Sequence, residues 1–108
     1  MNYNIDTIDS FRKEFKRLWK KYPSLKNDIE ALGNELSVNP IQGDKVFSNC
    51  YKVRLSIASK GKGKSGGARV ITYIKIVKRT VYLLTIFDKS EKENVEDWEI
   101  NALLKQIK

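Results

Sequence analysis

The spacing of apolar residues changes near Gly43, and that change limits the folds open to this chain. Before Gly43, apolar residues recur three or four positions apart, which is the spacing of amphipathic helices. After Gly43 they alternate with polar residues, as in a half-buried strand, at Tyr51, Val53, Leu55 and Ile57. Helices followed by strands are typical of an α+β domain, in which the helices cover a sheet.

The first part of the chain predicts two helices joined as a hairpin. A short strand over residues 3–7 comes first, and Asp9 or Ser10 then caps the first helix. Pro23–Ser24 ends that helix and begins the next, and Asn39–Pro40 ends the second. The two apolar stripes comprise Phe11, Phe15, Leu18, Trp19 and Tyr22 in the first helix, and Leu25, Ile29, Leu32 and Leu36 in the second.

The second part predicts three strands and a last helix. The strands are expected over residues 51–57, 68–77 and 80–87, and the two-residue connection at 78–79 is too short for a crossover, so they form an antiparallel meander. Asn94 is expected to cap the last helix, with Trp98 in the core. We therefore predict one domain over residues 1–108 in the order β-α-α-β-β-β-α. It is an α+β fold with a single twisted antiparallel sheet and helices packed on one face.

The composition excludes several classes of protein. The chain has no His and a single Cys, so Cys50 has neither a disulfide partner nor a histidine to activate it. No apolar run approaches the ~18 residues that a membrane span needs, and the first residues lack the apolar segment of a signal peptide. The sequence predicts a cytoplasmic protein.

The positive charge is concentrated in one segment. Residues 45–87 contain ten Lys or Arg and no Asp or Glu, whereas the other 65 residues carry 11 basic and 13 acidic side chains. The formal net charge of +8 therefore arises entirely within that segment. Such a one-sided positive field indicates a polyanionic partner, with nucleic acid as the first candidate. The ten cations are Lys45, Lys52, Arg54, Lys60, Lys62, Lys64, Arg69, Lys75, Lys78 and Arg79.

A glycine-rich basic loop over residues 60–69 lies at the centre of this segment. Its Lys62-Gly-Lys-Ser65 run partly matches a nucleotide-binding P-loop, but Ala58 stands where that motif needs glycine. A β-branched strand also follows the loop, where a P-loop needs a helix. Nucleotide binding is therefore disfavoured. A solvated loop remains the plain alternative, although Lys52, Arg54 and Arg69 on the flanking strands add to its charge.

Residues 51–73 and 82–89 resemble the RelE/ParE superfamily of toxins. The run Lys-Gly-Lys-Gly-Lys, followed by Gly-Gly-Ala-Arg, aliphatic residues and Tyr73, carries the resemblance, and within the superfamily it is most similar to HigB-type toxins. The resemblance implies a RelE-like fold and the toxin of a bacterial type II toxin–antitoxin system. It also implies a ribosome-dependent endoribonuclease that cleaves mRNA without metal or cofactor, and a cognate antitoxin, expected to be of helix-turn-helix type, in a toxin–antitoxin hetero-oligomer.

Such a nuclease needs a base for the 2′-hydroxyl, positive charge for the phosphorane and an acid for the 5′-oxygen. Without His, lysines crowded by other cations are the candidates for proton transfer, because crowding favours the neutral amine. Arg54 and Arg69 would stabilise the transition state, since a guanidinium binds phosphate bidentately. The candidate catalytic residues are Lys52, Arg54, Lys64, Arg69 and Lys89, and the candidate RNA-binding residues are Lys60, Lys62 and Tyr73.

Two points stay open at this stage. Many relatives carry an arginine just after the last strand and a tyrosine soon after it, whereas Lys89–Ser90 stands here. The general acid is therefore unassigned, with Lys89 and Lys64 as candidates. The alternatives to a nuclease are a ParE-like toxin that inhibits gyrase and a nucleic-acid-binding module without catalysis.

Overall fold

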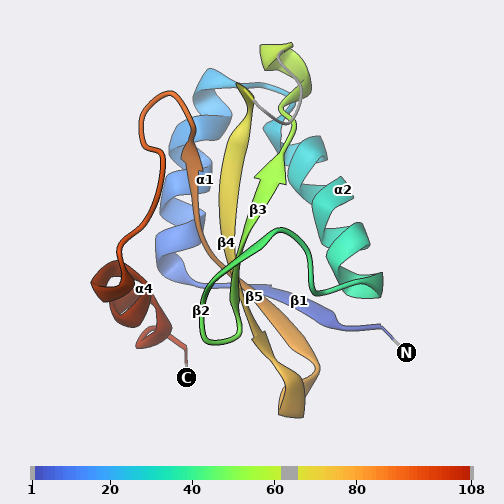
Figure 1. Cartoon of the computed structure of the whole chain (residues 1–108). Coiled ribbons are helices and arrows are strands. Elements are labelled where there is room, and N and C mark those ends of the chain that lie inside the picture. Colours follow the sequence, from blue (N-terminus) through green and yellow to red (C-terminus); the bar gives the residue numbers. More distant parts are fainter. Residues whose placement is uncertain (1, 62–65, 108) are drawn as a thin grey trace.

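The computed structural model describes residues 2–61 and 66–107. Figure 1 shows the course of the chain. The helices and strands are β1 (Asn4–Thr7), α1 (Asp9–Lys21), α2 (Leu25–Val38), β2 (Asp44–Phe47), β3 (Cys50–Leu55), β4 (Ala68–Lys75), β5 (Thr80–Asp88) and α4 (Asp97–Leu104), with 3-10 turns η1 (Ala58–Lys60) and η2 (Ile76–Lys78).

The strands form one mixed sheet in the order β1-β5-β4-β3-β2. The meander β3-β4-β5 is antiparallel, as predicted, and the α+β fold is confirmed. The expectation of a wholly antiparallel sheet was wrong at one edge, because β1 pairs with β5 in parallel. No tight turn joins these two strands, since both helices and three strands separate them, so the chain direction of β1 was unconstrained. Strand β2 was not predicted, because only four residues form it and they show no apolar alternation.

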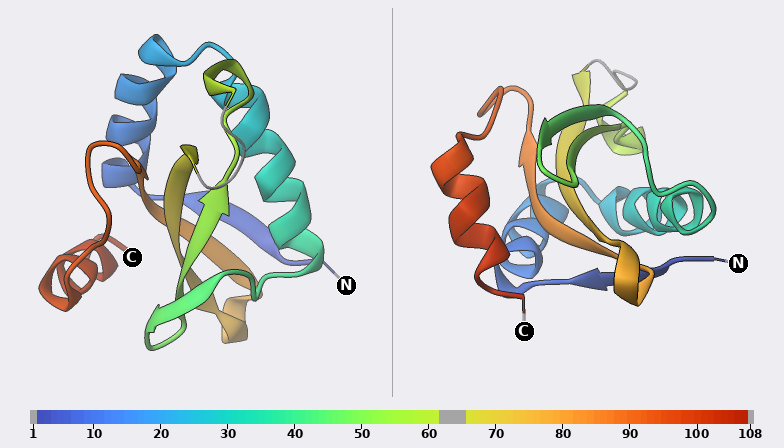
Figure 2. Two further views of the ribbon diagram at one scale, coloured as in Figure 1. Left: turned by 45° about the horizontal axis from the view of Figure 1, so that its top comes forward. Right: turned by 60° about the horizontal axis from the view of Figure 1, so that its bottom comes forward.

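Helices α1 and α2 pack on one face of the sheet, and this packing forms the core (Figure 2). The predicted apolar stripes supply it, with Leu18, Leu25 and Leu36 fully buried. Helix α4 lies beside α1 and the outer end of β5. The predicted burial of Trp98 was wrong: its side chain is 70% exposed, because α4 turns Ile100 inward instead. The cap of α4 is Glu96, which forms a capping box with Glu99, and is not Asn94.

Strand β2 lies unusually close to β3 at Gly43. A Cβ atom on Gly43 would lie 2.1 Å from the carbonyl oxygen of Lys52, and its φ of +80° is one that side-chain-bearing residues rarely adopt. The ladder pairs the next residue, Asp44, with Lys52. Glycine is therefore what allows β2 to cross the exposed side of β3 here.

Gly43→Ala is expected to lower the free energy of unfolding by about 1–3 kcal/mol, because the methyl group must displace backbone atoms. Gly33→Ala is the matched control, since Gly33 lies within α2 and an added Cβ meets nothing within 4 Å. That substitution should raise the free energy of unfolding by about 0.5–1 kcal/mol through helix propensity. Urea titrations of both variants measure the difference. Equal midpoints for Gly43→Ala and the parent chain would contradict the close approach of β2.

Candidate functional site

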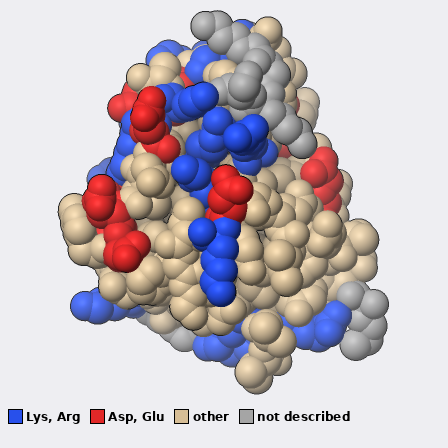
Figure 3. Space-filling view, viewed as in Figure 1, with Lys and Arg blue, Asp and Glu red and all other residues tan. Residues whose placement is uncertain are grey.

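Four of the predicted site residues line one pocket on the sheet face opposite α1 and α2. The pocket has a volume of about 330 Å³ and opens to solvent. Figure 3 shows Lys and Arg side chains gathered over the upper part of this face, with acidic side chains among them. We call it the cationic pocket, and its lining residues are Lys52, Arg54, Arg69, Lys89, Asp44 and Glu93.

The sheet register brings the two arginines together. Arg54 and Arg69 are direct partners across β3 and β4, so their side chains leave the same face. Arg69 is only 6% exposed, and its Nη1 donates a hydrogen bond to the carbonyl oxygen of Ala68 at 3.0 Å. Burial, and secondarily the charge of Arg54, lower the pKa of Arg69. The guanidinium is thus held in a partly desolvated place beside a second cation, where an anion would relieve the repulsion.

Both lysines reach the pocket from defined backbone positions. Lys52 lies two residues before Arg54 on β3, so the two share a face about 7 Å apart along the strand. Lys89 directly follows β5, and its backbone N–H donates to the carbonyl oxygen of Gly67 at 3.2 Å. That bond joins the end of β5 to the residues preceding Arg69. Cations from three different segments therefore face one volume, as the nuclease hypothesis requires.

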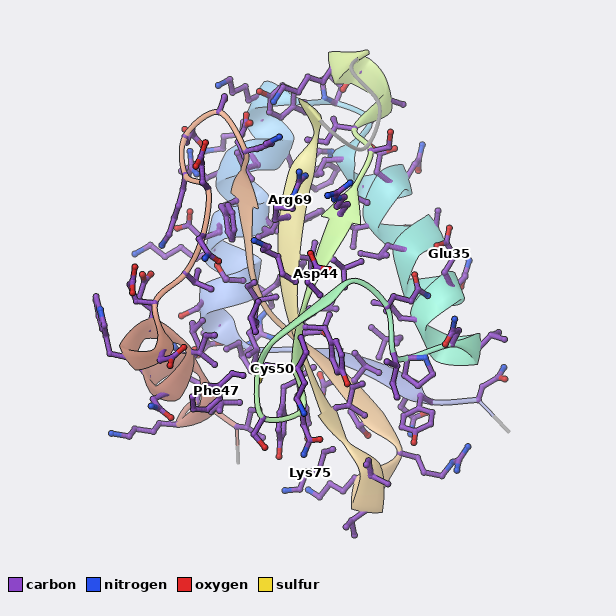
Figure 4. All side chains as sticks on the ribbon, viewed as in Figure 1. Glu35, Asp44, Phe47, Cys50, Arg69 and Lys75 are labelled. Atoms are coloured by element: carbon purple, nitrogen blue, oxygen red, sulfur yellow. The ribbon has the colours of Figure 1, made fainter. Side chains whose placement is uncertain are left out.

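Two carboxylates in the pocket were missed by the sequence analysis. Asp44 comes from β2, opposite Lys52, and Glu93 comes from the segment between β5 and α4. Figure 4 shows Asp44 and Arg69 on this face, each from its own strand. Gly43 could have pointed to Asp44, because a glycine beside a strand often marks a place where another backbone approaches closely. A side chain at position 43 would clash with the backbone of Lys52. Nothing in the sequence indicated that Glu93 would line this pocket.

Of the remaining predicted site residues, the two that the structure describes, Tyr73 and Lys60, do not line the cationic pocket. The ring of Tyr73 packs against that of Tyr82 with 6.2 Å between centroids, at roughly 13 Å along β4 from Arg69. Lys60 donates from Nζ to Oδ1 of Asp88 at 2.6 Å, and its side chain is only 13% exposed. Lys62 and Lys64 lie outside the described residues. The geometry thus supports neither Tyr73 nor Lys60 as a direct contact to a phosphate in this pocket.

A larger groove of about 630 Å³ lies between α1, the outer end of β5 and α4. Five of its charged side chains form ion pairs: Arg17 pairs with Glu14 at 3.2 Å and with Glu91 at 3.1 Å, and Lys92 pairs with Glu99 at 2.5 Å. Such pairs neutralise the groove, whereas the cationic pocket holds four cations and two carboxylates. The cationic pocket is therefore the better candidate for a polyanion site.

Other chemistry finds less support in the described part of the chain. Cys50 is fully buried, and burial raises the pKa of its thiol to about 11, which makes it a poor nucleophile. Within residues 2–61 and 66–107, no three His, Cys, Asp or Glu side chains are grouped as a metal site would need. No helix in those ranges is long and apolar enough to cross a bilayer.

Solved structures of similar fold include toxins and toxin–antitoxin complexes. Among them, the free Escherichia coli toxin RelE, in a mutant form, superposes with a TM-score of 0.65 at 17% identity, and the match covers 100% of both chains. The intact E. coli RelBE toxin–antitoxin complex matches with a TM-score of 0.60 at 17% identity, covering 80% of this chain and 95% of that one. The RelBE2 complex of Mycobacterium tuberculosis matches with a TM-score of 0.59 at 16% identity, covering 82% and 92%.

At these identities the structural matches establish the fold alone. The family assignment comes from the sequence, which matches the model for the RelE toxin of the RelE/RelB toxin–antitoxin system over residues 11–108. That match spans nearly the whole chain and includes every residue of the cationic pocket. The chain therefore belongs to the RelE toxin family.

Proposed function

We propose that this chain is the toxin of a type II toxin–antitoxin system and acts as a ribosome-dependent endoribonuclease that cleaves mRNA. The observation that carries the proposal is the convergence of Lys52, Arg54, Arg69 and Lys89 on one pocket. Four cations around one volume suit a single RNA phosphate flanked by its neighbours. Family membership supports the toxin class, and the pocket chemistry supports RNA as its target.

The reaction we propose uses the hydroxyl of the RNA itself as the nucleophile. A base takes the proton from the 2′-hydroxyl, the 2′-oxygen attacks the adjacent phosphorus, and the bond from phosphorus to the 5′-oxygen breaks. An acid returns a proton to that 5′-oxygen, so the products are a 2′,3′-cyclic phosphate and a 5′-hydroxyl. The step needs charge stabilisation and two proton transfers, and no electrons are exchanged.

The roles follow from the position of each side chain. Arg69 and Arg54, facing each other across β3 and β4, would hold the non-bridging oxygens as negative charge develops on them. Lys52 and Lys89 would serve the two proton transfers, because they approach the pocket from different segments. Asp44 is a further acceptor for the proton of the 2′-hydroxyl, opposite Lys52 in the ladder.

The partners we propose are mRNA, the ribosome and a cognate antitoxin. RelBE complexes of similar fold support an antitoxin that binds this chain in a hetero-oligomer. The resemblance to HigB-type toxins favours a helix-turn-helix antitoxin. A high positive charge also suits a ribosomal target, since the formal net charge is +8 and ribosomal RNA is a polyanion.

Incubation of the purified chain with ribosomes that hold a defined mRNA tests the proposal. We expect cuts at codon-defined positions that disappear when ribosomes are omitted, with the fragment ends mapped by primer extension. Intact mRNA together with inhibition of gyrase supercoiling would favour the ParE-like alternative. RNA binding without cleavage, with no effect on gyrase, would leave a binding module. Either of those results overturns the nuclease.

A further inference from the structure

Asp88 is a fully buried carboxylate outside the cationic pocket, and four hydrogen bonds converge on it. Lys60 Nζ donates to Oδ1 at 2.6 Å, and the Tyr22 hydroxyl donates to Oδ2 at 2.5 Å. The backbone N–H and the hydroxyl of Ser90 both donate to Oδ1 at 2.9 Å. We call these four residues, Tyr22, Lys60, Asp88 and Ser90, the Asp88 node.

The node is strong enough to keep the carboxylate charged. Burial alone would raise the pKa of Asp88, but the hydrogen bonds from Lys60, Tyr22 and Ser90 outweigh burial and hold that pKa well below its usual range. The same contact with Asp88 raises the pKa of the Tyr22 phenol. A buried carboxylate that accepts four hydrogen bonds, one of them from an ammonium, holds its partners in one geometry.

The node joins three segments, one of which continues directly into the cationic pocket. Tyr22 follows α1, Lys60 ends η1, and Asp88 ends β5 directly before Lys89. The Asp88 side chain contacts Tyr22 and Lys60, whereas Lys89 lines the pocket. The backbone carbonyl of Asp88 also accepts from the N–H groups of Glu91 and Lys92, so the turn that carries Lys89 is bound through both the side chain and the backbone of Asp88.

We infer that Asp88 is a positioning residue, which holds the turn bearing Lys89 and the η1 end of the basic loop in the geometry that the cationic pocket needs. The inference rests on the proposed nuclease function and assigns Lys60 a different role from RNA contact. Lys60 neutralises Asp88 in the interior, and it acts on the pocket through the node. An amine that is paired and 13% exposed is poorly placed to bind a second anion.

The test compares Asp88→Asn, Lys60→Met and Tyr22→Phe with Leu36→Ala, each confirmed as folded by circular dichroism at the assay temperature. Leu36 is fully buried in α2 and lies outside the node, so its variant reports the effect of lost stability alone. For Asp88→Asn and Lys60→Met we expect kcat on ribosome-bound mRNA to fall about 10–100-fold with little change in KM, because misplaced groups cost rate rather than binding. The kcat of Tyr22→Phe should fall less, and the kcat of Leu36→Ala should equal that of the parent chain.

Three outcomes overturn the inference while leaving the nuclease intact. The first is an equal kcat for Asp88→Asn and Leu36→Ala. The second is a raised KM for Lys60→Met while Asp88→Asn keeps the kinetics of the parent chain, which would indicate that Lys60 contacts RNA directly. The third comes from amide hydrogen exchange, which needs no substrate. Asp88→Asn should accelerate exchange over residues 58–61 and 88–92 together, and unchanged protection there would contradict the node. An inactive parent chain would overturn the proposed function, and the exchange result would still decide the inference.

Discussion

Arg69→Ala is expected to lower the rate of mRNA cleavage on the ribosome by about 100–1,000-fold, the loss typical of a removed transition-state donor. Arg69 is the most buried cation of the pocket, at 6% exposure, and faces Arg54 across the sheet. Its charge therefore lies in a partly desolvated place, where it acts more strongly on a phosphate than an exposed charge would. Single-turnover cleavage of a ribosome-bound mRNA measures the rate. Arg69→Lys should recover only part of it, since an ammonium cannot bind two oxygens in a fixed plane.

Arg12→Ala is the matched control for charge. Arg12 lies on α1, away from the cationic pocket, and hydrogen-bonds to Thr7 and Asp9. Loss of the same charge there should leave the cleavage rate nearly unchanged. Equal losses in Arg12→Ala and Arg69→Ala would mean that net charge, and not the pocket, governs the reaction.

Asp88→Asn is expected to lower the free energy of unfolding by about 3–5 kcal/mol at neutral pH, because it leaves the Lys60 ammonium in the interior without its counter-charge. The pH dependence follows from the lowered pKa of Asp88 in the folded chain. The carboxylate contributes its full stability above its unfolded pKa of about 3.9, and this contribution is lost as the pH falls toward the folded value. The parent chain should therefore lose stability steeply below about pH 4, and Asp88→Asn should show a shallower loss.

Urea titrations between pH 2 and 7 measure both effects. Asp9→Asn is the control, since the Asp9 side chain is 91% exposed in its pair with Arg12 and should contribute less than about 1 kcal/mol. An Asp88→Asn chain as stable as Asp9→Asn would show that the buried pair contributes little. Parallel pH profiles for Asp88→Asn and the parent chain would contradict the lowered pKa.

The parts of the fold that periodicity controls were predictable from the sequence. The stripe that buries Leu18 required a helix. The connection between β4 and β5 runs over residues 76–79 rather than the predicted 78–79, but it is still too short for a crossover and so required an antiparallel pair. Strand β1 was located from sequence, but its parallel pairing with β5 depends on a contact across some 75 residues, which no local pattern encodes. Trp98 was misplaced because α4 is short, so a small change in the direction of its inward face moves a residue from core to surface.

The same contrast applies to the site. Lys52 and Arg54 were recognised because residues two apart on a strand share a face, and Arg69 because it begins the next strand. Charge in the sequence could not reveal that Lys60 is paired with Asp88, which lies 28 residues away. Charge in the sequence also gave no indication that Asp44 would line the pocket, because the position of β2 depends on its pairing with β3 and not on its own residue pattern. Pairing across the fold, rather than local sequence, decides which cations remain available to a ligand.

The attack of the RNA's own hydroxyl in the cationic pocket is the central claim, and a single 2′-deoxy substitution in the mRNA tests it most directly. The modified nucleotide is placed immediately before the cleaved bond in a ribosome-bound message, and single-turnover cleavage is compared with that of the all-ribose message. Removal of the nucleophile should abolish cleavage at that bond, while the all-ribose message yields a 2′,3′-cyclic phosphate and a 5′-hydroxyl. Equal cleavage of both messages would contradict the mechanism.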